Sequence, residues 1–218
     1  MALITQAQAR PYLTAENYET SDTTGLLTLR GPAVVALAYG CGVRDSEIIR
    51  LKRKHWRIGG EDRIEVDPDE GPVGTQRPLS FHRIVPIAEH VSTLVEAYLA
   101  HLPTPPGPDD CLIRSLKGEN IGRPELTGQM RNPSRGRDDV EARTLPSFAA
   151  AFATAMAREE DERLEAYVTG SRPPDGSPWV KRAPPWDLVQ AAFRRHAPLW
   201  KINRSFYHVI RRRGGTDR

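Results

Sequence analysis

The sequence lacks long apolar runs and has few cysteines. Its longest uninterrupted apolar stretch, Pro32 to Tyr39, is far shorter than the ~20 residues of a membrane helix, and the first ten residues contain no signal-peptide core. The two cysteines, Cys41 and Cys111, cannot form a disulfide framework or a four-ligand zinc site. We therefore expect a cytoplasmic protein in a reducing compartment, without membrane association.

Signatures of several common enzyme classes are also missing. The chain contains no phosphate loop ending in Gly-Lys-Ser/Thr, no His-Glu-x-x-His, no Gly-x-Ser-x-Gly and no Cys-x-x-Cys. Its histidines are scattered, and no two of them are spaced i, i+4. These absences argue against a metal site, and we expect neither a metal nor a cofactor.

What the chain does contain is an uneven distribution of charge. Its 218 residues carry a net charge of +3, but the segment from Arg172 to Arg218 has 11 basic and 3 acidic residues, a local charge of +8. Clustered Lys and Arg are typical of surfaces that neutralise nucleic-acid phosphates, because binding releases condensed counterions. A solvated basic helix would give the same count, so charge alone leaves both interpretations open.

Apolar periodicity and turn residues predict a mainly α-helical domain with a small antiparallel β-sheet. Two short alternating segments, 63–66 and 82–87, predict strands of that sheet. The polar, Gly- and Arg-rich segment 117–147 is expected to be an exposed loop insertion in a single domain, 1–218. Helices are expected directly after Thr14 and over residues 28–39, 45–53, 88–102, 148–167, 186–196 and 204–213.

One arginine stands between a glycine-broken helix end and the start of a new helix. In Tyr-Gly-Cys-Gly-Val-Arg-Asp-Ser-Glu-Ile, residues 39–48, the Arg44 guanidinium can help the helix dipole to hold an anion. The segment resembles the Tyr-x-Thr-Gly-Leu-Arg-x-Ser-Glu-Leu motif in the catalytic domain of the tyrosine recombinase (phage integrase) family. It matches that motif at Gly42, Arg44, Ser46 and Glu47.

Two further segments extend this resemblance in the same order along the chain. Arg-Ile-Val-Pro-Ile at residues 83–87 is similar to the family's Arg-x-Val-Pro-Leu strand. Residues 201–207 resemble its His-x-x-Arg box, with Arg204 as the second arginine and Lys201 at the histidine position. The resemblance implies a recombinase catalytic-domain fold and a role in DNA binding, recombination and integration.

The resemblance also implies which residues would carry the chemistry. Strand cleavage passes through a pentacoordinate phosphorus that bears extra negative charge, and two guanidiniums, here Arg44 and Arg204, would stabilise it. Together with Lys201, these arginines are the candidate catalytic residues. The candidate DNA-binding residues are basic side chains of the hairpin and the C-terminal segment, namely Arg77, Arg83, Arg194, Arg195, Arg211, Arg212 and Arg213.

The chain departs from the family's pattern at two places. The hairpin at residues 74–83 has no lysine to act as general acid, and Arg77 or His82 would have to replace it. Only 14 residues follow Arg204, so the family's nucleophilic tyrosine has no counterpart there, and Tyr207 is expected to be a buried helix residue. We therefore expect a C-terminally truncated or diverged recombinase domain that is inactive alone.

Several alternatives stay open. Arg44 could cap neighbouring carbonyls or pair with Glu47, Arg204 could belong to a solvated basic helix, and Lys201 could be a surface lysine. The same scaffold could serve a non-catalytic DNA-binding regulator, or the chain could be an unrelated basic helical protein. Under the leading interpretation its partners are double-stranded DNA and other recombinase protomers.

Overall fold

The computed structural model describes residues 4–18, 26–66, 82–115, 117–171 and 183–201. Its helices are α1 (Gln6–Leu13), α2 (Leu26–Cys41), α3 (Asp45–Ile48), α4 (Glu89–Ala100), α5 (Arg123–Gln129), α6 (Leu145–Met156), α7 (Glu162–Thr169) and α9 (Trp186–His196). Its strands are β1 (Trp56–Arg57), β2 (Arg63–Val66) and β3 (Arg83–Pro86). Short 3₁₀ helices lie at Ala15–Asn17, Arg53–His55, Asn132–Ser134 and Pro198–Lys201.

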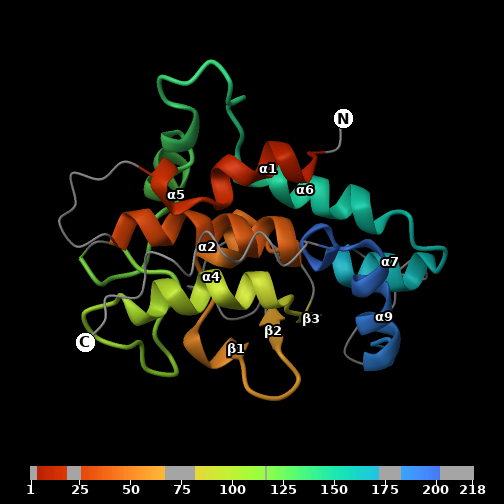
Figure 1. Cartoon of the computed structure of the whole chain (residues 1–218). Coiled ribbons are helices and arrows are strands. Elements are labelled where there is room, and N and C mark those ends of the chain that lie inside the picture. The colour runs from red at the N-terminus through yellow and green to blue at the C-terminus, as the bar shows by residue number, and fades with distance from the viewer. Residues whose placement is uncertain (1–3, 19–25, 67–81, 116, 172–182, 202–218) are drawn as a thin grey trace, which may run out of the picture.

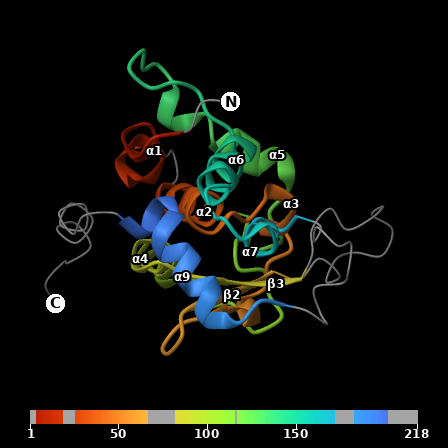
Figure 2. The same ribbon diagram turned by 90° about the vertical axis from the view of Figure 1, so that its right-hand side faces the viewer.

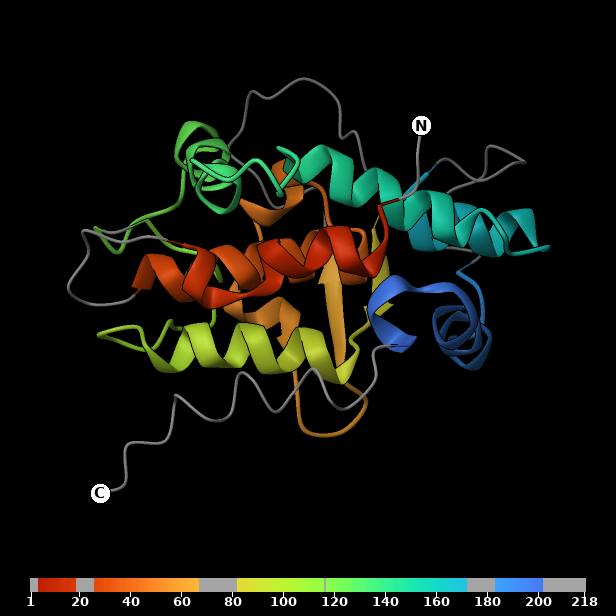
Figure 3. The ribbon, with the colours of Figure 1, turned by 45° about the horizontal axis from the view of Figure 1, so that its top comes forward.

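Helix α2 is the centre of the core. It lies between α1 and α6 on one side and α4 on the other (Figures 1 and 3). Residues 33–38 are at most 1% exposed, as expected of a helix that is apolar on all its faces. The ring of Phe148 from α6 packs edge-on against Tyr12 and Tyr39, at centroid distances of 5.1 and 5.8 Å. The predicted helix at 28–39 is therefore confirmed as the core helix.

The predicted antiparallel sheet is also confirmed. Its strand order is β1-β2-β3, and Ile64 of β2 lies opposite Trp56 on one side and Val85 on the other. These three side chains are at most 1% exposed, so one face of the sheet belongs to the core. The sheet lies below α2 in Figures 1 and 2.

A buried arginine ties the segment around α5 to the central helix. The Arg30 side chain in α2 is 1% exposed, and its Nη2 lies 2.7 Å from the Glu125 carboxylate of α5. Its Nε donates to the Gln129 side-chain oxygen at 2.9 Å, and its Nη1 donates to the Arg114 carbonyl at 2.7 Å. A buried guanidinium with all these acceptors is well compensated, so it fixes α5 firmly against the core.

This anchoring corrects the prediction of a plain exposed loop at 117–147. The segment contains α5, and Ile121, Leu126 and Met130 are at most 3% exposed. The prediction missed these three apolar positions because Gly, Arg and other polar residues dominate the composition of the segment. The segment is therefore a partly helical layer on the core, with its polar residues outward.

Three predicted helices have different bounds. The helix expected over 45–53 is only the single turn of α3, Asp45–Ile48, and a 3₁₀ helix begins at Arg53. Thr14 is the C-cap of α1, which is itself capped at its start by Thr5, and only a 3₁₀ turn follows Thr14. The expected single helix over 148–167 is two helices, α6 and α7, because Asp161 accepts from two backbone N–H groups and starts α7. Residues 157–161 connect the two helices, and the charged residues Glu162 and Arg163 belong to α7. No helix within the described parts of the chain has the length and apolar character of a membrane span.

Candidate nucleic-acid interface

The turn after α2 places Arg44 at the start of α3. Gly42 adopts φ of 64°, and the N–H groups of Gly42 and Val43 donate to the Ala38 and Leu37 carbonyls, which closes the end of α2. A Cβ at Gly42 would come within 2.3 Å of the Phe152 ring. Glycine is therefore required here both by the backbone conformation and by the close approach of α6.

Arg44 is held at both its backbone and its side chain. Its backbone N–H donates to Glu47 Oε2 at 2.7 Å. Its Nη2 donates to the carbonyls of Thr169 and Gly170, both at 3.2 Å, at the C-terminal end of α7. Since these carbonyls lie at the negative end of the helix, the contact supports the alternative in which Arg44 caps neighbouring carbonyls. Burial lowers the pKa of the Arg44 guanidinium, and the charge of Glu47 partly offsets this.

Arg83, predicted as a DNA-binding residue, is a core residue instead. Its side chain is 0% exposed, and Nη1 and Nη2 donate to the two carboxylate oxygens of Glu47 at 2.8 and 3.0 Å. Nη2 also donates to the Gly42 carbonyl at 3.2 Å. Because its side chain has no exposed surface, Arg83 cannot contact a DNA phosphate, and this corrects that part of the prediction. We call Glu47, Arg83 and their contacts to Gly42 and Arg44 the Glu47 network.

Arg44 lines a pocket of about 320 Å³ between α3, α6 and α7. Its α6 wall consists of the small side chains of Pro146, Ala149, Ala150 and Ala153 together with the ring of Phe152. Glu165, Thr169 and Ser171 form the opposite wall. Among the lining residues that the structure describes, Arg44 is the one cation, so the second guanidinium of a two-arginine clamp is not contributed by α6 or α7.

The other predicted site residues are only partly placed. Lys201 ends the last 3₁₀ helix, but its side chain, like Arg77, Arg204, Tyr207 and Arg211 to Arg213, lies outside the described residues. The expected proximity of Arg44 and Arg204 is therefore still a prediction. Arg194 is exposed near the end of α9, and its neighbour Arg195 pairs with Glu159. His82 bonds to Glu65 at 2.9 Å, and this hydrogen bond lowers the pKa of Glu65.

The five tyrosines within the described residues are all at most 4% exposed. Tyr12, Tyr18 and Tyr39 donate their hydroxyls to backbone carbonyls, at distances of 2.7 to 2.9 Å. The Tyr98 and Tyr167 hydroxyls accept from the backbone N–H groups of Arg114 and Ile84. Burial raises the pKa of Tyr18, Tyr98 and Tyr167, and raises that of Tyr39 to about 12. These hydroxyls are structural and are poor nucleophiles.

Sequence reasoning missed the arginines on the surface beside α5. Arg131 and Arg135 are exposed, and neither forms an ion pair with the described residues. Arg131 lines a second pocket, which shares Asp45 and Pro146 with the pocket at Arg44. The only sequence signal was the Gly- and Arg-rich composition of 117–147, which does not reveal which side chains share a surface.

Comparisons with known proteins agree on the fold. The crystal structure of XerA recombinase matches all of this chain and 65% of its own, with a TM-score of 0.58 and 17% identity. The Tn1549 transposon integrase in complex with transposon right end DNA matches 88% of this chain and 65% of its own, with a TM-score of 0.59 and 15% identity. The XerH recombinase bound to its difH substrate gives a TM-score of 0.54 at 14% identity, over 94% of this chain and 51% of its own.

The fold is thus that of a tyrosine recombinase catalytic domain. No protein-family model matches the chain, but the tyrosine recombinase XerC of Methylobacterium sp. (strain 4-46) is 35% identical to it over 89 residues. These residues are 41% of this chain and 25% of XerC, so the match spans only a quarter of that relative. The fold, the Arg44 motif and this partial match all point to similarity with tyrosine recombinases.

Proposed function

We propose that this domain binds double-stranded DNA in site-specific recombination or integration, as a diverged tyrosine recombinase domain. The observation that carries the proposal is the position of Arg44, a half-buried guanidinium that lines a surface pocket in a fold whose solved neighbours include recombinases on DNA. A guanidinium held by two carbonyls is pre-oriented, and a charged group fixed in this way at a pocket suits the recognition of a phosphate.

Within the described residues, the Arg44 pocket supplies a group for phosphate binding but not the full set of groups for strand cleavage. Cleavage needs two fixed cations at the phosphorus and a nucleophile aimed at it. Among the described residues, the pocket offers one cation, and the five tyrosine hydroxyls are committed to backbone groups. The expected partners are duplex DNA and other recombinase protomers. Sedimentation of the chain bound to duplexes with one or two binding sites would test whether protomers associate on DNA.

The test of this proposal is the salt dependence of duplex binding by the full chain. Fluorescence anisotropy with a labelled duplex should give an affinity that falls steeply with salt, with a log–log slope of about −0.9 for each phosphate contacted. Arg44→Gln should weaken binding and reduce the slope. Arg158→Gln is the matched control, because Arg158 is an exposed arginine just beyond the far end of α6.

Two results would overturn the proposal. One is an affinity that is absent at low salt or insensitive to salt. The other is an equal loss in Arg44→Gln and Arg158→Gln, which would indicate diffuse attraction only. A suicide DNA substrate completes the test: we expect no covalent complex, and an adduct that disappears in Tyr207→Phe would show that this residue attacks phosphorus.

A further inference from the structure

A second pocket, of about 360 Å³, lies beside the pocket at Arg44. It is formed by the end of α5, the 3₁₀ turn that follows and the start of α6. Asp45 and Pro146 line both pockets, so the two hollows adjoin on one surface. A ligand that extends from Arg44 past Asp45 and Pro146 therefore reaches the second pocket.

The lining of this pocket combines an apolar floor with a polar rim. Met130 and Leu145 are each 3% exposed and form the apolar part. Hydroxyl groups of Thr127 and Ser134 and the guanidinium of Arg131 lie at the rim. Such a lining suits a ligand that joins an anion to a small apolar group, as a phosphodiester joins its phosphate to deoxyribose.

Arg143 contributes an unsatisfied donor to the same pocket. Its side chain is 15% exposed, and its backbone N–H is fixed by donating to the Tyr12 hydroxyl at 2.8 Å. One end of its guanidinium pairs with Glu141. Its Nε is buried and has no hydrogen-bond partner among the described residues. An acceptor that enters the pocket would satisfy this donor, whereas in the free protein it loses its hydration without compensation.

Arg131 is the arginine in the lining of this pocket that has no acidic partner among the described residues. Arg123 pairs with Asp45, and Arg137 pairs with Asp139. Arg131 is exposed and forms no ion pair with the described residues. Its charge is therefore not neutralised locally, and it is the residue of the rim best able to attract a phosphate.

We propose that this second pocket binds a backbone phosphate of the same DNA strand that contacts Arg44, with Arg131 and Arg143 as the binding residues. The adjoining sugar packs on Met130 and Leu145. This inference rests on the proposed function, since it takes the DNA over Arg44 as given. A continuous strand is favoured over a free anion because the two pockets adjoin at Asp45 and Pro146, so that neighbouring phosphates of one strand can occupy both.

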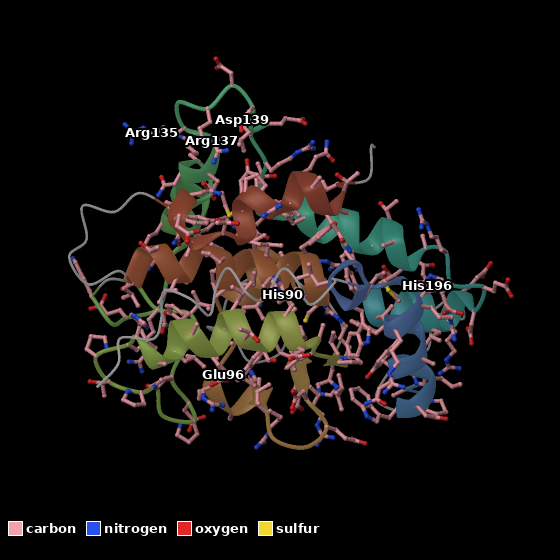
Figure 4. The ribbon with its side chains drawn as sticks, viewed as in Figure 1. His90, Glu96, Arg135, Arg137, Asp139 and His196 are labelled. Carbon is pink, nitrogen blue, oxygen red and sulfur yellow. The ribbon has the colours of Figure 1, made fainter. Side chains whose placement is uncertain are left out.

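The test compares Arg131→Gln with Arg135→Gln in the full chain. Both are exposed arginines of one short segment without ion pairs to described residues, but Arg135 does not line the pocket. Figure 4 shows Arg135 with Arg137 and Asp139 at the outer end of the turn that follows α5. Arg131→Gln should reduce the log–log salt slope by about 0.9, which corresponds to one phosphate contact, and Arg135→Gln should leave it unchanged.

Ethylation interference locates the same contact on the DNA. One ethylated phosphate should weaken binding of the unmodified protein and of Arg135→Gln, and should have a clearly smaller effect in Arg131→Gln, in which Arg143 alone remains at that phosphate. Equal slopes for the two variants, or interference that is undiminished in Arg131→Gln, would overturn the inference and leave the proposed function standing. A wild-type chain that does not bind duplex DNA would overturn both. Competition by a deoxynucleoside monophosphate at micromolar concentration would instead indicate a free-nucleotide site and also contradict the inference.

Discussion

The arginines below the surface and those beside α5 differ in what surrounds them. Arg83 is completely buried and shares the Glu47 carboxylate with the backbone of Arg44. Arg131 and Arg135 are exposed and lack ion pairs with the described residues. The first arrangement removes charge from reach of any ligand, and the second keeps it accessible. Arg44 stands between the two, with one end in the Glu47 network and the other in a pocket.

This difference teaches that a basic residue within a recognised motif need not be the residue that contacts DNA. Arg83 matches the family's strand motif, yet its role here is to hold Glu47 and the turn at Gly42 in place. The comparison predicts that substitutions in the Glu47 network act on stability, whereas substitutions at Arg131 act on DNA binding.

The largest expected effect is the loss of the carboxylate in Glu47→Gln. The Arg83 guanidinium would then be buried without a counter-charge, and breaking a buried pair in this way typically costs about 3–5 kcal/mol. Urea unfolding followed by circular dichroism measures this loss.

The double variant Glu47→Gln/Arg83→Met is the control for that prediction. Because it removes both charges, we expect it to recover part of the stability that Glu47→Gln loses. A single variant that unfolds at the wild-type urea concentration would show that the Glu47 network is not the interior support that we describe.

The next effect is a pH dependence from a buried histidine at the start of α4. His90 is 0% exposed, and burial lowers its pKa to about 4. In the unfolded chain the pKa is about 6.5, so the unfolded state takes up the proton first as the pH falls. The free energy of unfolding should therefore decrease between about pH 6.5 and pH 4, by on the order of 3 kcal/mol in total.

His90→Gln should flatten this pH profile, whatever its effect on stability at pH 8. His101→Gln is the control, because His101 is exposed at the end of α4. Urea unfolding between pH 4 and pH 8 gives both profiles. A slope that survives in His90→Gln would assign the pH dependence to another group.

A smaller effect separates two glycines with the same backbone conformation. Gly170 and Gly136 have φ of 69° and 68°, so alanine at either position costs about 1–2 kcal/mol of backbone strain. A Cβ at Gly170 would also lie 2.6 Å from Arg83 Nη1, whereas nothing lies within 4 Å at Gly136. Thermal unfolding should show Gly170→Ala to be less stable than Gly136→Ala by about 1–2 kcal/mol. Equal losses would mean that Arg83 moves aside without cost.

Much of the fold could be predicted from local patterns. The apolar run at 28–39 and the alternation in Arg63–Val66 are strong periodic signals, and α2 and β2 match them. The break after Met156 was harder to predict, because the charged residues at 158–163 are also compatible with the solvated face of one continuous helix. Helix α7 begins as a separate helix because the Asp161 side chain accepts hydrogen bonds from backbone N–H groups of its first turn, and apolar periodicity does not reveal such a cap.

The site was less predictable than the fold because it depends on contacts between distant segments. Arg44 was found from its place between two helices. The burial of Arg83 depends on Glu47, which is 36 residues away in the sequence, so strand alternation alone could not show it. The pocket at Arg131 and Arg143 depends on the anchoring of α5 by Arg30, a contact across about 100 residues.

Photo-crosslinking from DNA phosphates tests the central claim most directly. A duplex with azidophenacyl groups on single phosphorothioates is bound to the full chain and irradiated, and the crosslinked peptides are identified by mass spectrometry. The account predicts crosslinks in peptides that contain Arg44 and residues 123–146, from neighbouring phosphates of one strand. Crosslinks confined to α4 or to the β1–β2 hairpin would contradict it.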